Sequence, residues 1–129
     1  MALTILDQIV THLQFLGFQV ERDDNIVKAR HATKVNILLR DFRGGVLLTS
    51  IFGCKDYAKR YRPEYLDFIN QMNQKAAVIR FYADKDSDFF MEAWYPGTYD
   101  RSLFGSFLDL WDEDITRLAQ GDLAAKFLQ

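Results

Sequence analysis

The 129-residue sequence has one cysteine, Cys54, and therefore lacks the second thiol that an internal disulfide requires. A lone thiol is easiest to maintain in a reducing compartment, so we expect a cytoplasmic protein. The sequence also lacks any run of about 20 apolar residues, the length of a membrane-spanning helix. Its first residues have no basic region, and Asp7 and His12 interrupt their apolar pattern. We therefore expect neither a signal peptide nor a membrane anchor.

An excess of charge of one sign is absent as well. The chain has 16 basic and 18 acidic residues and a formal net charge of −2. Such a balance creates no overall field that attracts nucleic acid or an anionic membrane. Aromatic residues are abundant, at 15% of the chain, and they call for burial or for a partner. The length predicts one domain, residues 1–129.

Three segments have the apolar spacing of helices. The first is residues 4–16, with Thr4 as a candidate N-cap and Gly17 as the residue that ends the helix. The second is residues 63–74, where Pro63 suits the first helical position. The third begins after Asp100, another candidate N-cap, and stops at Gly121. The tail, residues 122–129, is expected to form only a docking turn, because eight residues do not hold a helix in water.

Six segments have the character of strands. Residues 18–22 and 26–29 form a predicted hairpin, because the intervening Asp23, Asp24 and Asn25 favour a turn. The other strands are expected at residues 34–40, 46–52, 77–83 and 89–95. Residues 53–62 are read as a loop or a partial helical turn. The predicted fold is α+β, with an antiparallel β-sheet and the element order α-β-β-β-β-α-β-β-α.

Several of these strands are apolar on both faces, including residues 46–52 and 89–95. A sheet with two partly apolar faces must be covered on both sides. The first and last helices can cover one face, whereas the middle helix has a thinner apolar stripe. A second subunit or another partner is therefore a reasonable source of the remaining cover.

No residue pattern indicates an enzyme, a metal or a cofactor, and we expect none. The acidic run of Asp109, Asp112, Glu113 and Asp114 is read as a solvated helix face, with Glu113 and Arg117 paired one turn apart. His12 and His31 lack the partner spacing of metal ligands. Cys54 is read as a buried structural thiol, because only Lys55 is adjacent to lower its pKa.

A basic and aromatic stretch, residues 55–62, provides the alternative hypothesis. In it, Lys55, Lys59, Arg60 and Arg62 alternate with tyrosines, and Asp56 dilutes the charge. Tyrosines can stack on bases while Lys and Arg contact phosphates. The stretch therefore allows a small regulatory domain that binds a ligand or nucleic acid, although the negative net charge argues against nucleic acid.

Taken in order, the segments resemble a known family. A hydrophobic helix ending in LGF-V-E, the segment from Asn70 to Asn73, the strand pair VIRFYADKDSDFFMEAW and an aromatic-rich last helix look like the YbjN family, bacterial proteins of the type III secretion chaperone-like fold. The resemblance implies a compact α+β domain that commonly dimerises and recognises protein. Its family label, a proposed sensory-transduction regulator, names no chemistry. Asn70 and Asn73 are signature positions, and their amides are expected to cap the middle helix or tie it to the next strand.

The leading hypothesis is thus a non-enzymatic, cytoplasmic protein-interaction module, expected to be a homodimer, with a chaperone-like or regulatory role. The expected partner or dimer surface consists of Tyr65, Met72, Phe90 and Trp94. These residues come from the middle helix and from the more polar face of the last hairpin.

Overall fold

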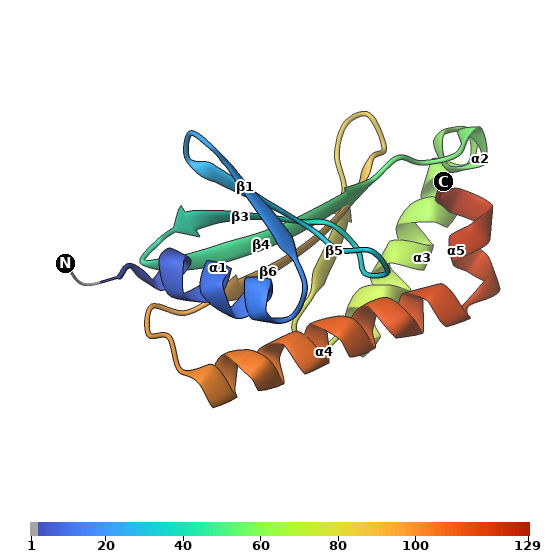
Figure 1. Cartoon of the computed structure of the whole chain (residues 1–129). Coiled ribbons are helices and arrows are strands. Elements are labelled where there is room, and N and C mark those ends of the chain that lie inside the picture. The colour runs from blue at the N-terminus through green and yellow to red at the C-terminus, as the bar shows by residue number, and fades with distance from the viewer. Residues whose placement is uncertain (1–2) are drawn as a thin grey trace. The chain divides into compact units, whose positions relative to one another are not determined.

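The computed structural model describes residues 3–129, which form five helices and one six-stranded antiparallel sheet (Figure 1). The elements are α1 (Ile5–Phe15), β1 (Gln19–Asp23), β2 (Ile26–Arg30), β3 (Ile37–Phe42), β4 (Gly45–Phe52), α2 (Asp56–Arg60), α3 (Arg62–Lys75), β5 (Arg80–Ala83), β6 (Phe89–Tyr95), α4 (Arg101–Gln120) and α5 (Asp122–Phe127). The α+β class and the order of the main elements are confirmed. The short helices α2 and α5 replace the predicted partial turn and docking turn.

The strands are arranged in the order β1-β2-β3-β4-β6-β5. The chain folds as two compact units, the first extending to Ser50 and including Ala93–Phe107, the second comprising Ile51–Glu92 and Leu108–Gln129. β4, β6 and α4 therefore contribute residues to both units. Within residues 3–129, none of the helices has the length and apolar character needed to cross a bilayer.

Helix α1 begins and ends at the residues that its sequence predicts. The Thr4 hydroxyl accepts the N–H of Asp7, and the Asp7 carboxylate accepts the N–H of Thr4, which completes a capping box. Hydrogen bonds to the Asp7 carboxylate, first from Thr4 and then from Arg22, hold the pKa of this group below its ordinary value. Gly17 has φ +97°, a conformation that favours glycine, and it turns the chain toward β1.

In the first unit, β1 pairs with β2, β2 with β3 and β3 with β4, all antiparallel. Val27 lies opposite Leu39, and Leu39 lies opposite Leu48, so buried apolar residues line one face of the sheet. Helix α1 packs against β1 and β3. Tight turns at Asp24 (φ 54°) and Arg43 (φ 50°) connect β1 to β2 and β3 to β4.

β3 begins at Ile37, three residues later than predicted. The His31 imidazole causes this difference, because its Nδ1 accepts the N–H of Thr33 at 3.1 Å and that of Lys34 at 3.3 Å. These bonds hold the chain in a turn where the apolar alternation indicated a strand.

In the second unit, an aromatic cluster joins α3 to α5. The Phe127 ring packs on Tyr65 at 5.4 Å and on Phe68 at 5.3 Å, measured between ring centroids. Backbone bonds hold the tail in place, because the N–H of Lys55 donates to the Phe127 carbonyl and that of Gln129 to the Gly53 carbonyl. Anchoring of this kind explains why so short a segment is helical.

Asp114 corrects the interpretation of the acidic run as a solvated face. Its side chain is fully buried and accepts the N–H groups of Ala77, Val78 and Ile79 at 2.9–3.1 Å. Because Asp114 takes these donors, β5 begins at Arg80 instead of residue 77. Arg117 contacts Asp114 at 3.2 Å in place of the predicted pairing with Glu113.

Candidate functional site

Two of the four predicted surface residues lie in the core. Tyr65 is 0% exposed and donates its hydroxyl hydrogen to the Ser87 carbonyl at 2.8 Å, and Met72 is 9% exposed. Both side chains lie on the buried stripe of α3, which also includes Phe68 and Ile69. The prediction that Tyr65 and Met72 belong to an accessible surface is therefore wrong, because a helix with a single apolar stripe buries that stripe first.

Phe90 and Trp94 are more accessible, but each is engaged within its own unit. Phe90 is half-buried and stacks on Tyr82, with 4.9 Å between ring centroids. Trp94 is 46% exposed, and its indole N–H donates to the Phe42 carbonyl at 2.8 Å. Gly45 leaves room for this indole, since a Cβ there would lie 2.7 Å from Nε1. That a partner covers these two rings stays a prediction.

Asn73 ties the middle helix to the next strand. Its amide nitrogen donates to the Phe81 carbonyl at 2.9 Å, and its amide oxygen accepts the Phe81 N–H at 2.8 Å. This pair of bonds is the structural role expected for the signature amides. Asn70 lies exposed on α3.

The basic stretch divides into structural and solvent-facing residues. Lys55 donates to the Ala125 carbonyl at 2.5 Å, and Arg62 donates to the Ser87 hydroxyl. Lys59 and Arg60 are exposed on α2. Lys59 and Arg62 line an open pocket of about 400 Å³ together with Lys85, Asp86 and Ser87.

No metal-binding constellation lies within the described residues, since no three His, Cys, Asp or Glu side chains are grouped as ligands. Cys54 is buried and forms a short β-bridge with Leu128. His31 binds backbone amides of its own turn, as described above.

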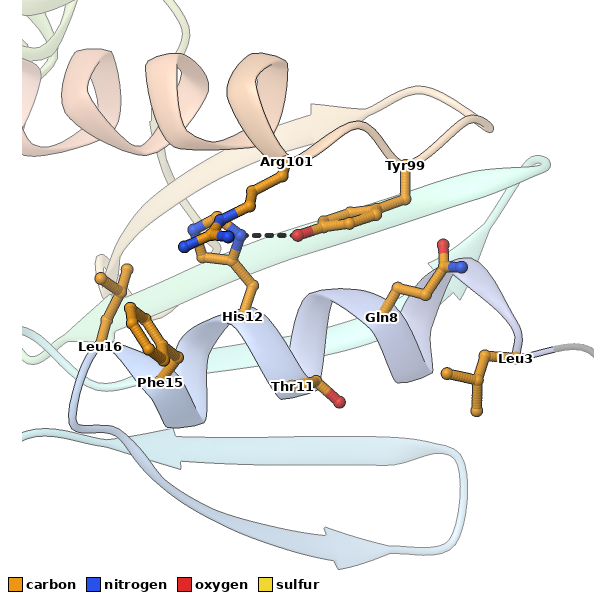
Figure 2. Close-up of a pocket in the computed structure, with 8 residues that line it drawn as sticks. All are labelled: Leu3, Gln8, Thr11, His12, Phe15, Leu16, Tyr99 and Arg101. Atoms are coloured by element: carbon orange, nitrogen blue, oxygen red, sulfur yellow. Dashed lines mark hydrogen bonds between the residues drawn. The ribbon is translucent and has the colours of Figure 1, made fainter.

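A pocket of about 400 Å³ lies in the first unit, between α1 and the segment that leads into α4. Its apolar wall consists of Leu3, Phe15 and Leu16, and its polar end consists of His12, Tyr99 and Arg101; Gln8 and Thr11 complete the lining. Figure 2 shows Arg101 reaching from the start of α4 toward α1, where it lies near His12 and Phe15. A mostly apolar cavity with a few convergent polar groups has the usual composition of a binding site.

The rim of this pocket carries exposed large apolar side chains. Phe15 is 78% exposed and Leu3 63%, and Leu16 is also exposed. We refer to these three residues as the α1 surface. The prediction of a helix over residues 4–16 did not single out Phe15. A signal was present, because Phe15 lies outside the stripe of Leu6, Ile9 and Leu13 that α1 buries.

His12 marks the polar end of the pocket. Its Nδ1 is hydrogen bonded to the Tyr99 hydroxyl oxygen at 2.8 Å, and its ring packs edge-on against Phe104 at 5.0 Å. Burial, and then the positive charge of Arg101, lower the pKa of His12 below its ordinary value. His12 is therefore neutral at pH 7, and Arg101 is the cationic group in the pocket lining.

Arg101 forms no ion pair with any carboxylate of the described residues. Its guanidinium lies 5.5 Å from the centroid of the Phe15 ring, a cation–π contact at the pocket rim. The neighbouring carboxylate of Asp100 is occupied in capping α4, where it accepts the N–H of Leu103 at 2.9 Å. The pocket thus combines an apolar wall with a cation that lacks a counter-charge.

Comparison with known proteins identifies a fold and no sequence relative. No protein-family profile matches this chain, and no curated protein sequence is significantly similar to it. The crystal structure of YbjN from E. coli, a proposed transcription regulator, superposes with a TM-score of 0.74 over 96% of this chain and 95% of that protein, at 14% sequence identity. The chain therefore has a YbjN-like fold, as its sequence predicted.

Proposed function

We propose that this protein is a non-enzymatic interaction module that binds a protein partner through the α1 surface. The observation that supports this proposal is the exposure of Phe15 and Leu3, at 78% and 63%, beside an apolar pocket. Contiguous exposed apolar side chains, especially with polar groups beside them, mark interaction sites in soluble proteins. The site differs from the one predicted by sequence, because Tyr65 and Met72 are buried.

The energetic argument rests on the size of these side chains. Fully burying a Leu or Phe side chain contributes about 1.5–3 kcal/mol. Burying even half of the α1 surface would therefore contribute several kcal/mol before the costs of association are subtracted. Interaction surfaces commonly concentrate their binding energy in a few central apolar and aromatic residues.

We propose a second copy of the chain as the first partner to test, and a regulatory or chaperone-like role in the cytoplasm. The YbjN-like fold is compatible with such a role, and YbjN itself is a proposed transcription regulator. Two side chains of types that often take part in catalysis have structural roles here. Asp114 accepts hydrogen bonds from backbone amides, and His31 stabilises a turn. This supports the proposal that the module is not an enzyme.

The test is a double variant, Phe15→Ser with Leu3→Ser, examined by light scattering over micromolar concentrations and by pull-down from lysate. The expected result is an oligomer for the unaltered protein and a monomer for the variant, with unchanged circular dichroism. Leu66→Ser is the matched control, since Leu66 is an exposed leucine of α3. A strictly monomeric unaltered protein that captures no partner, or a double variant that keeps the partner, would contradict the proposal.

The second candidate is a ligand-binding role for the basic pocket near α2. Lys59 and Lys85 line it, and Arg62 contributes a third cation that is held by Ser87. The double variant Lys59→Gln with Lys85→Gln should abolish any amide chemical-shift response to inorganic phosphate. If the amide shifts that phosphate causes in the unaltered protein are not confined to this pocket, the candidate role is dismissed.

A further inference from the structure

We propose that the pocket beside α1 binds a small amphiphile with an apolar body and a single carboxylate, the carboxylate being held by Arg101. This proposal goes beyond the protein-partner function, because it concerns a small molecule in the pocket interior and depends on Arg101. The two share Leu3, Phe15 and Leu16, so a bound amphiphile would compete with a docked protein.

The apolar wall accounts for the body of the ligand. Leu3, Phe15 and Leu16 present large side chains to a cavity of about 400 Å³, near the lower end of the size range of small-molecule pockets. An alkyl chain or an aromatic ring placed there would remove both its own surface and these exposed side chains from water. The gain is largest at Phe15, which is among the most exposed of them.

The polar end accounts for the head group. The Arg101 guanidinium is planar and presents paired N–H donors, a geometry that matches the two oxygens of a carboxylate. The cation–π contact with Phe15 keeps the guanidinium at the pocket rim. The Tyr99 hydroxyl, already bonded to His12, supplies a further hydrogen-bonding group at the same end.

Charge selects a monoanion over other head groups. An ammonium head would be repelled by Arg101, and a neutral head would leave the guanidinium without a counter-charge. A phosphate dianion is matched less well, because His12 is neutral and Arg101 is the one cation of the lining. Near His12, the charged and ionisable groups are Arg101 and Tyr99, while the Asp100 carboxylate caps α4.

The experiment is an NMR titration of the ¹⁵N-labelled full chain with three probes of equal chain length: octanoate, octanol and octylamine. We expect octanoate to shift the amides of α1 and of the Tyr99–Arg101 segment. Octanol and octylamine should bind about two- to fivefold more weakly or not at all, the factor expected for one exposed charge pair. Bound octanoate should also raise the pKa of His12, followed through its ring proton, because a nearby anion favours the imidazolium.

Arg101→Gln should weaken octanoate binding by about the same factor, whereas Arg30→Gln, an exposed arginine of β2, should leave it unchanged. Thermal unfolding confirms that both variants fold. Equal affinity for octanoate and octanol, an Arg101→Gln variant that binds as the unaltered protein does, or shifts located away from α1 would overturn the proposal. Should self-association cover the pocket, octanoate should shift the protein toward the monomer, because the oligomer and the ligand share Leu3, Phe15 and Leu16. If octanoate binds but the protein forms no oligomer and captures no partner, only the partner function is refuted.

Discussion

The structure predicts that removal of the Asp114 side chain strongly destabilises the second unit. Its carboxylate is fully buried on α4, and Oδ2 accepts the N–H groups of Ala77, Val78 and Ile79 at 3.1, 2.9 and 3.0 Å. Oδ1 accepts the Ala77 N–H at 2.9 Å and contacts Arg117 at 3.2 Å. One side chain thus satisfies the three backbone donors immediately before β5.

The expected loss of stability depends on which of these N–H donors water can reach once Asp114 is removed. The Ile79 amide is buried, so losing its acceptor incurs a desolvation penalty of about 1–3 kcal/mol. The amides of Ala77 and Val78 are partly accessible and regain part of their bonding from water. We therefore expect Asp114→Ala to lower the free energy of unfolding by about 3–5 kcal/mol.

Asp114→Asn should cost less, about 1–2 kcal/mol. An asparagine oxygen placed at the Oδ2 position keeps one bond to each of the three amides. Its NH₂ group takes the place of Oδ1 and loses the contact with Arg117 and the second bond from the Ala77 N–H. The two variants together therefore separate the backbone bonds from the ion pair.

Urea unfolding followed by circular dichroism measures both values, and hydrogen exchange of the Val78 and Ile79 amides locates the effect. Glu113→Gln is the control, since this neighbouring exposed carboxylate should change stability by no more than about 0.5 kcal/mol. An Asp114→Ala variant within about 1 kcal/mol of the unaltered protein, or unchanged exchange at the two amides, would refute the reasoning.

Three further predictions follow from single contacts. Asn73→Ala should lower the free energy of unfolding by about 1–2 kcal/mol, because two bonds tie α3 to β5, whereas the exposed Asn70→Ala should change it little; equal effects would contradict this role. Tyr65→Phe should cost about 1 kcal/mol in the same assay, because it removes one buried hydrogen bond, and an unchanged midpoint would refute that. Because folding lowers the pKa of His12, the unfolded chain binds the proton more readily, and stability should fall as pH drops through the ordinary value of 6.5 toward the folded pKa. His12→Gln should remove this part of the pH dependence; a variant with the original slope would show that other groups cause it.

Local patterns predicted most of the secondary structure correctly. Thr4, Asp7 and Gly17 define both ends of α1 through bonds and dihedral angles that depend on a few neighbouring residues. The amide of Asn73 likewise acts over a short distance in the sequence, from α3 to β5. Such features can be read from sequence because the interacting groups lie close along the chain.

The errors at β5 and at Tyr65 came from bonds between distant parts of the chain. The late start of β5 depends on Asp114, which lies more than 30 residues away along the chain. Burial of Tyr65 depends on its bond to Ser87 and on packing of its ring against Phe127 of the tail. The packing of Phe127 also stabilises the tail as a helix. Neither contact leaves a mark in the local pattern, so the residue that looked available for a partner was in the core.

The sequence by itself determined the α+β class, the order of the main helices and strands and the resemblance to a YbjN-like fold. These follow from apolar periodicity and from caps and turns, which are properties of neighbouring residues. Only the tertiary structure decided which apolar side chains remain exposed and which charges lack a partner. Phe15 and Arg101 are far apart in the sequence, and their contact beside a shared pocket exists only because folding brings α1 to the start of α4.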